Sequence, residues 1–422
     1  MSSTDTLTIP SSNSRLSLGS TATIVQSLHT QPILFPEIWL LVFPYLKPQD
    51  LRSVSLTCVV FRYLAQPLLF SVLDVSPFLL SYNAERPILR PRNYLERCQE
   101  RLEYYKLPHI AHGVHHCWIS PYTRSGFPAR NQQDDLEPSL IIDTVLEALP
   151  LFPNLSTLSW HCIDITPEWW NVIQTVSIKK LWLNSSTIPL SISSPFPSIT
   201  HLDLDQWPWE GRVTNHVSIH EERSLGVSEI ALNHVIQPEV IQTISVPRAD
   251  TARHLFSVLS QMTYGLRTLK IPFSSVTDPN FLPALEHCPT LESLCIFPPS
   301  SDERSRDAAI DSLPATTLPA LTKYEGPYSH IMQFSRQPLQ KIVLWGFDDS
   351  PALCDPDALV RSVSDLAETG TVDSLRSLQV TVVDITHDLL EVFAPFTRLE
   401  SIIIQSQDSS PKDLPFSHFP RM

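Results

Sequence analysis

Three histidines and a cysteine stand close together in one short stretch of the chain, at positions 112–117. His112, His115, His116 and Cys117 are residue types that hold Zn²⁺ in proteins. The side chains of a strand alternate between its two faces, so a strand here would point His115 and Cys117 one way and His116 the other. Cys117 also occupies an apolar position of a repeated pattern that is described below. We therefore expect an ordinary strand with polar outer positions, with no metal and no cofactor.

Paired carboxylates occur at three places, Asp134-Asp135, Asp348-Asp349 and Asp203 with Asp205. General acid–base catalysis needs a carboxyl group whose pKa is raised by burial in a cleft. The first two pairs stand in turn-like stretches, where Asp commonly caps and solvates loops. The third pair shares one face of an expected strand without such a cleft. We expect no catalytic residue among them.

Glycine is scarce, with nine glycines against 38 prolines in 422 residues. Phosphate-binding loops, dinucleotide turns and nucleophile elbows all need glycine, and the motifs GxGxxG, GxxxxGK[ST] and GxSxG are missing from the sequence. The composition therefore predicts that the chain is not an enzyme.

Net charge and cysteine content further limit the classes of protein to which the chain can belong. A formal net charge of −14 argues against binding to nucleic acid, which needs clustered Lys and Arg. A hydrophobic content of 42% indicates a globular protein. Seven scattered cysteines without a CxxC motif are typical of reduced thiols, which favours a cytoplasmic or nuclear location. No apolar run is long enough to span a membrane, and the N-terminus lacks the pattern of a secretory signal.

Short amphipathic helices are expected between Ile33 and Phe70. Pro36 and Pro48 suit first helical positions, and Pro67 is expected to disfavour helix at Gln66. About forty residues are too few to bury this much apolar surface without a partner. We therefore expect another protein to complete one apolar face.

This stretch resembles an F-box, the helical segment by which substrate receptors dock onto the Skp-type adaptor of SCF ubiquitin ligases. The matching residues are Leu34-x-Pro36-Glu37-Ile38, Phe43-x-Tyr45-Leu46-x-Pro48-x-Asp50-Leu51 and Leu56-x-Cys58-x-x-Phe61-Arg62. The chain departs from the family at Phe35, Lys47 and Val59-Val60, where proline, a hydroxyl N-cap and basic residues are common. The alternative is an ordinary three-helix piece of a protein core.

The resemblance implies a non-catalytic substrate-recognition subunit of an SCF-type ligase, which binds the Skp-type adaptor, through it a cullin, and an unknown protein substrate. The implied adaptor-binding residues are Leu34, Pro36, Glu37, Ile38, Leu41, Phe43, Leu46, Pro48, Leu51, Val54, Cys58 and Phe61. An F-box scaffold or regulatory protein without a role in degradation remains the second interpretation.

The body of the chain repeats a pattern apolar-x-x-apolar-x-apolar, with the tightest spacings between about 21 and 27 residues, as in leucine-rich repeats. The copies are Val114–Ile119, Leu155–Trp160, Ile178–Leu183, Ile199–Leu204, Val227–Leu232, Leu266–Ile271, Leu291–Ile296, Leu339–Leu344, Leu375–Val380 and Leu399–Ile404. A weaker copy is expected over Leu318–Tyr324, with Lys323 in an apolar position. A further strand is expected around Val72–Val75. Helices are expected over 93–105, 138–149, 167–175, 251–262 and 355–368.

The repeats resemble the divergent leucine-rich repeats of fungal-type F-box proteins. The implied fold is α/β: a three-helix F-box followed by an irregular solenoid, with parallel strands on its concave face and helices and loops outside. The expected domains are a disordered tail (1–30), the F-box (31–72), a linker and helix (73–109), the repeat region (110–410) and a C-terminal tail (411–422). An irregular two-layer α/β domain is the alternative.

Positions between the apolar residues of the repeat should line the exposed face of the strands, where a substrate would bind. These positions are Lys179, Lys180, Trp182, His201, Asp203, Arg267, Lys270, Glu292, Lys341 and Arg376. Their charges are mixed, so they do not name the charge of a target. Trp169-Trp170 and Trp207 with Trp209 are candidates for binding hot spots, although packing between repeats is the more common use of large aromatics.

Overall fold

The structure is a computed structural model of the 422-residue chain. It describes residues 35–75, 78–79, 88–89, 94–120, 138–161, 165–184, 186, 188–189, 196, 198–204, 229–298, 313–314, 316–346, 354–382 and 385–406. Outside these ranges lie the predicted tails, Leu34, the aspartate pairs at 134–135 and 348–349, Asp205, Trp207 and Trp209. The chain divides into two compact units, residues 1–68 and 69–422.

The first unit contains short helices where the sequence predicts them. They are α1 (Pro36–Val42), the 3-10 turn η1 (Phe43–Tyr45), α2 (Pro48–Ser55) and α3 (Val59–Leu69). A proline opens both α1 and α2, where its missing N–H costs nothing. Lys47 precedes α2 without a side-chain capping bond, so this helix start depends on Pro48 and on Asp50 in the first turn.

Helix α3 is longer than expected. The sequence predicts a break before Pro67, but the helix continues through Pro67 to Leu69. Proline inside a helix costs about 3 kcal/mol. Leu64, Ala65 and Leu68 keep helical spacing across the proline and are buried or half-buried, so burial of this stripe outweighs the lost backbone hydrogen bond.

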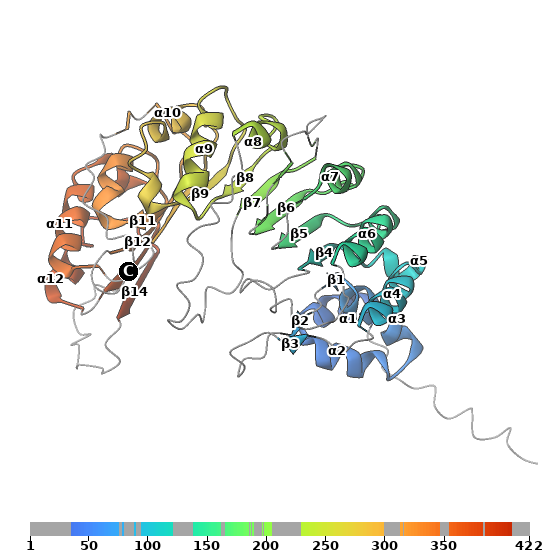
Figure 1. Ribbon diagram of the computed structural model, residues 1–422. Helices are drawn as coiled ribbons and strands as arrows, with labels where there is room; N and C mark the ends of the chain where they lie inside the picture. Colours follow the sequence, from blue (N-terminus) through green and yellow to red (C-terminus); the bar gives the residue numbers. More distant parts are fainter. Residues whose placement is uncertain are drawn as a thin grey trace, which may run out of the picture. The chain divides into compact units, whose positions relative to one another are not determined.

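The second unit is a mixed α/β structure built on one twelve-stranded sheet, in which every neighbouring pair is parallel (Figure 1). The strands follow chain order: β1 (Val72–Val75), β4 (His116–Ile119), β5 (Thr157–His161), β6 (Lys180–Asn184), β7 (His201–Leu204), β8 (Thr243–Ser245), β9 (Thr268–Pro272), β10 (Ser293–Phe297), β11 (Lys323–Pro327), β12 (Lys341–Trp345), β13 (Ser377–Val382) and β14 (Ser401–Ser406). A separate antiparallel pair joins β2 (Phe78–Leu79) to β3 (Ile88–Leu89).

Helices connect most of these strands and lie along one side of the sheet (Figure 1). They are α4 (Tyr94–Tyr105), α5 (Pro108–Ala111), α6 (Pro138–Ala148), α7 (Pro167–Gln174), α8 (Glu229–Val235), α9 (Ala249–Leu259), α10 (Phe281–Glu286), α11 (Pro356–Ala367) and α12 (His387–Glu391), with 3-10 turns η2 (Leu149–Leu151), η3 (Phe273–Ser275), η4 (Tyr328–Phe334) and η5 (Gly370–Asp373). The five predicted helices correspond to α4, α6, α7, α9 and α11. Thr166 and Asp355 cap α7 and α11 by accepting backbone N–H bonds at 3.2 Å each.

Alternation along the strands separates a core face from an open face. The second and fourth residues of the strands, such as Leu158 and Trp160 on β5, are buried in one continuous hydrophobic core with the helices. The first and third residues therefore point to the open face, away from the helices. We use the name open face for this side of the sheet.

Two copies of the repeat were predicted at the wrong place. The Val227–Leu232 segment falls largely in helix α8, because Leu232, Val235 and Ile236 recur at helical spacing and are buried. The strand of this repeat is β8, whose apolar residues are Ile241, Ile244 and Val246.

The weak copy expected over 318–324 is shifted by three residues. Its apolar positions are Leu321, Tyr324 and Gly326, all buried, and Lys323 lies on the open face of β11. Gly326 fills the last apolar position because the Tyr324 ring folds back over it. The Tyr324 hydroxyl donates to the Pro327 carbonyl at 3.1 Å, and a Cβ on residue 326 would lie 2.5 Å from that hydroxyl oxygen.

The first edge of the sheet is sealed by helix α4. The Tyr105 hydroxyl donates to the Val72 carbonyl at 3.0 Å, and the Arg101 guanidinium reaches the Asp74 carbonyl at 3.5 Å. Both carbonyls belong to β1 and point away from β4, so side chains occupy acceptors that a further strand would use.

We predict that Gly326→Ala destabilises the second unit by about 1–3 kcal/mol, because the added methyl group clashes with a fully buried tyrosine ring. Urea unfolding followed by tryptophan fluorescence measures this change. Gly370→Ala is the matched control, since nothing lies within 4 Å of its added Cβ. Equal stability of the two variants would contradict the packing described for Tyr324.

Candidate functional site

The interior of the first unit is small and aromatic. The rings of Trp39, Phe43 and Phe61 form a closed trio with centroid distances of 5.8, 4.9 and 5.5 Å. Phe43 is 1% exposed, and Leu51 and Ala65 are the other buried apolar residues between 35 and 68. The ring contacts join α1, η1 and α3, and Leu51 is the buried residue of α2.

Most other large apolar side chains of this unit face solvent. Tyr45 is 89% exposed and Leu41 72%. Ten of the sixteen exposed large apolar residues in the described part of the chain fall within positions 35–68. We call these ten the apolar helical surface: Phe35, Ile38, Leu40, Leu41, Val42, Tyr45, Leu56, Val59, Val60 and Tyr63. Exposed apolar side chains this concentrated along the sequence make these helices a candidate interaction surface.

The residues implied to bind an adaptor differ in accessibility. Exposed are Pro36, Glu37, Ile38, Leu41, Pro48 and Cys58; half-buried are Leu46, Val54 and Phe61; buried are Phe43 and Leu51. The two buried residues support the helices rather than offering a contact surface.

Sequence reasoning missed eight members of the apolar helical surface. They are Phe35, Leu40, Val42, Tyr45, Leu56, Val59, Val60 and Tyr63. Only Val59 and Val60 could have been identified from the sequence, because each stands where basic residues are common in F-box sequences.

Six of the predicted substrate-binding residues lie on the open face of the sheet. They are Lys180, Trp182, His201, Asp203, Lys270 and Lys341, in first or third strand positions. Direct cross-strand partners are Lys180 with His201 and Trp182 with Asp203.

The other four predicted residues do not lie in these rows. Lys179, Arg267, Glu292 and Arg376 each precede a strand, at the amino-terminal rim of the sheet. Arg267 pairs with Glu292 at 3.3 Å, and Arg376 pairs with Glu400. The ten residues predicted to share one face therefore occupy two places, the open face and a separate rim. The ion pairs of the rim are exposed and contribute little stability individually.

Four aromatic rings on strands β4, β5 and β6 gather on the open face. The Trp118 and His161 rings stack with centroids 4.1 Å apart, and His116 lies 6.2 Å from Trp118 and 5.6 Å from Trp182. His116 Nε2 and the Ser159 hydroxyl are 2.7 Å apart. We call His116, Trp118, His161 and Trp182 the aromatic–histidine cluster. Only Trp182 was expected as a binding residue.

Burial governs the charges in and beside this cluster. It lowers the pKa of His161 to about 4, with His116 as a second cause. Burial likewise lowers the pKa of His116, against the opposing effect of Asp74. Burial raises the pKa of Asp203, while the Ser245 hydroxyl and Lys270 oppose that rise. At neutral pH the two cluster histidines are therefore uncharged.

The histidines and cysteine at 112–117 point to different partners. His112 Nδ1 lies 2.6 Å from the Pro108 carbonyl oxygen, and His115 Nδ1 lies 3.2 Å from the Asn154 carbonyl oxygen. Cys117 is buried, and its thiol pKa is raised by that burial. Among the described residues, the group whose potential ligand atoms come within 4.8 Å of one another is instead His387, Asp388 and Glu391, exposed on α12.

The paired tryptophans of α7 are packing residues. Trp170 is buried against Phe196 with centroids 5.5 Å apart. Trp169 lies 5.8 Å from Trp160, and its indole N–H donates to Asp143 at 2.7 Å. Packing between repeats is therefore their structural role.

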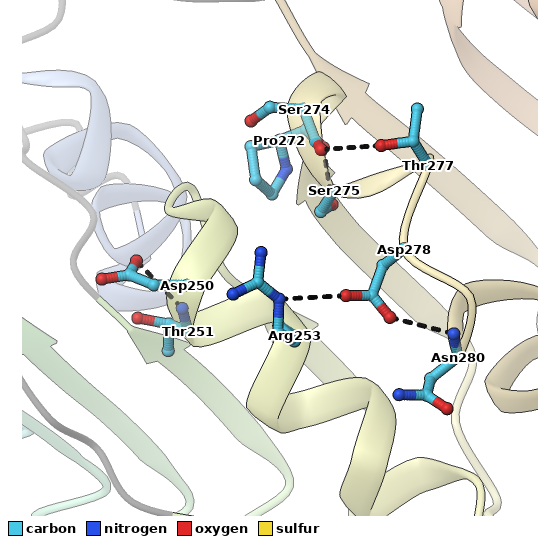
Figure 2. Close-up of polar contacts among 9 residues, drawn as sticks. All are labelled: Asp250, Thr251, Arg253, Pro272, Ser274, Ser275, Thr277, Asp278 and Asn280. Carbon is cyan, nitrogen blue, oxygen red and sulfur yellow. Dashed lines mark hydrogen bonds and ion pairs between the residues drawn. The ribbon is translucent and has the colours of Figure 1, made fainter. Parts of the chain in front are cut away.

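A small polar hollow lies between α9 and the turn after β9 (Figure 2). Arg253 Nε contacts Asp278 Oδ2 at 3.2 Å, and Asp278 Oδ1 accepts the Asn280 N–H at 2.9 Å. The Asp250 carboxylate accepts the Thr251 N–H at 3.0 Å. These groups shape the ends of local elements, and their polar atoms are used in doing so.

Comparison with known proteins adds no family to this description. No family model matches the chain, and no curated protein matches it. None of the helices in the described part of the chain combines the length and apolar character needed to cross a membrane. The apolar helical surface and the open face are the two features of the molecule from which a function can be inferred.

We predict that acid destabilises the fold partly through His161, which is 3% exposed. Its folded pKa of about 4 lies below the ordinary value of 6.5, so the unfolded chain takes up the proton first as pH falls through 6.5. Stability is then fully present above that pH and declines toward pH 4. Between pH 7.5 and pH 5 the loss from this residue should be about 2 kcal/mol.

Urea unfolding at both pH values measures this loss. His161→Phe keeps a ring on Trp118 and should lose about 2 kcal/mol less than the unaltered chain. His254→Phe, at an exposed position on α9, should behave like the unaltered chain. An identical acid response in all three proteins would refute the assignment.

Proposed function

We propose that the chain is the substrate-recognition subunit of an SCF-type ubiquitin ligase. The first unit acts as an F-box that binds a Skp-type adaptor and through it a cullin, and the second unit holds a target protein. The observation that carries this proposal is the apolar helical surface, which gathers ten exposed large apolar side chains on positions 35–68.

The energetics favour a permanent partner for this surface. Burying one large apolar side chain contributes roughly 1.5–3 kcal/mol of favourable free energy. Burial of even half of the ten would therefore offset much of the free-energy cost of association. Glu37, Asp50 and Arg52 are exposed beside them and supply a polar rim. A buried aromatic trio with apolar residues outside it is the arrangement expected of a small helical module that is completed by another chain.

The second unit suits the holding of a target. We interpret its sheet as a leucine-rich-repeat solenoid, because parallel strands follow one another in chain order and share one core. Such a stack leaves a long row of side chains on its open face. Catalysis would belong to other subunits, and this chain would contribute proximity between target and conjugating enzyme.

We predict that Leu41→Asp weakens capture of a Skp-type adaptor at least tenfold. The side chain is 72% exposed, so the change places a charge in the interface without disturbing the aromatic trio. Affinity purification of the tagged chain with quantification of the co-purified adaptor measures the effect. Leu151→Asp is the control, because Leu151 is an exposed leucine of η2 in the second unit. Equal adaptor capture by the unaltered chain and both variants would contradict the proposal.

The role in degradation needs its own measurement. Removal of the chain should raise the level of at least one protein, and the unaltered chain, but not Leu41→Asp, should restore that level. Adaptor binding without any accumulating protein would instead indicate a scaffold.

A further inference from the structure

The open face differs in charge from the rest of the molecule. The whole sequence has 44 acidic residues against 30 basic ones. The first and third positions of the twelve strands hold Lys180, Lys270, Lys323 and Lys341 against Asp74, Asp203 and Glu325. The bias of the chain is therefore reversed on this face, which points to an acidic partner.

The lysines are not equally available. Lys323 pairs with Glu325 on its own strand at 3.0 Å. Within the described ranges, Lys180 and Lys341 form no ion pair, and both are exposed. Lys270 and Lys180 both interact electrostatically with Asp203 on this face. Lysine side chains are thus distributed from β6 to β12, and one carboxylate lies between two of them.

The spacing of these lysines sets the form of the partner. Lys180, Lys270 and Lys341 lie on β6, β9 and β12, three strands apart in the sheet. At about 4.8 Å per strand they are about 15 Å apart, which an extended chain spans in about four or five residues. Phosphates in a nucleic acid are far more closely spaced, so the lysine spacing fits an acidic polypeptide segment better.

The aromatic–histidine cluster stands at one end of this lysine row. Trp118 and Trp182 are half-buried, and β5 places the small Ser159 between them. His161 Nε2 is buried there without a hydrogen-bond partner. Half-buried indoles are the side chains that most often anchor an apolar residue of a partner.

We propose that the open face binds an extended acidic segment of a protein, with an apolar residue on the aromatic–histidine cluster and carboxylates on Lys180, Lys270 and Lys341. This inference rests on the proposed function, because the acidic segment would belong to the target protein that the chain recognises. The segment crosses the strands from β4 toward β12.

Fluorescence anisotropy with labelled peptides tests the proposal on the full chain. The probe has two leucines near one end and three glutamates spaced about four residues apart, separated by serine and glycine. We expect micromolar binding that weakens with salt. Replacing the glutamates by glutamine, or the leucines by serine, should weaken binding at least tenfold.

Variants of the chain separate the contacts. Lys180→Glu and Lys341→Glu should each weaken binding of the glutamate peptide at least fivefold, whereas Arg336→Glu, at an exposed position in the turn after η4, should not. Glu325→Gln removes a competing carboxylate and should tighten binding about threefold, a gain that misfolding cannot produce.

Several results would overturn the inference. They are absence of peptide binding, equal binding of the glutamine peptide, insensitivity to Lys180→Glu and Lys341→Glu, or tighter binding of a single-stranded RNA of similar length. Leu41→Asp should bind the peptide normally even though it loses the adaptor. Failure of the peptide assay with intact adaptor capture would therefore reject only this inference, and the reverse result would reject only the adaptor.

Discussion

The parallel ladder of backbone hydrogen bonds is the constraint on which the second unit depends. Its strands pair in one constant register from β4 to β14. Because side chains alternate along a strand, burial of Leu158, Leu181 and Leu202 also decides which residues are exposed. The core therefore determines which positions line the open face, and a residue inserted into one strand would exchange the two faces of that strand.

Much of the sheet could be predicted because apolar residues alternate with other residues at the end of each repeat, which is the period of a strand. Prediction failed where that period was ambiguous. Positions 227–232 satisfy the strand pattern by chance, yet Leu232, Val235 and Ile236 form a helical stripe. Near β11 the tyrosine and glycine that replace two aliphatic residues concealed the true register. Helix α3 continues beyond its predicted end at Pro67, because burial of the neighbouring side chains outweighs the unfavourable helix propensity of proline.

The candidate sites were predicted less completely than the fold. The helices between Ile33 and Phe70 could be predicted from the spacing of their apolar residues. The exposure of Tyr45 and Leu56 depends on how these helices pack together, which a local sequence pattern does not show. The aromatic–histidine cluster depends on contacts between residues more than forty positions apart, such as His116 with Ser159. Sequence reasoning placed Lys180 and Lys270 on the correct face, whereas it could not separate them from Arg267 and Glu292, which form a rim pair.

The bonds from Tyr105 and Arg101 to β1 give the twelve-stranded sheet a defined first edge. Repeats that stack by strand pairing could otherwise continue from one molecule into the next, because a bare edge accepts any new strand. Two occupied carbonyls on a strand of four residues remove that opportunity at this edge. Head-to-tail polymerisation requires two complementary ends, so side chains bound to the backbone of β1 work against the growth of filaments.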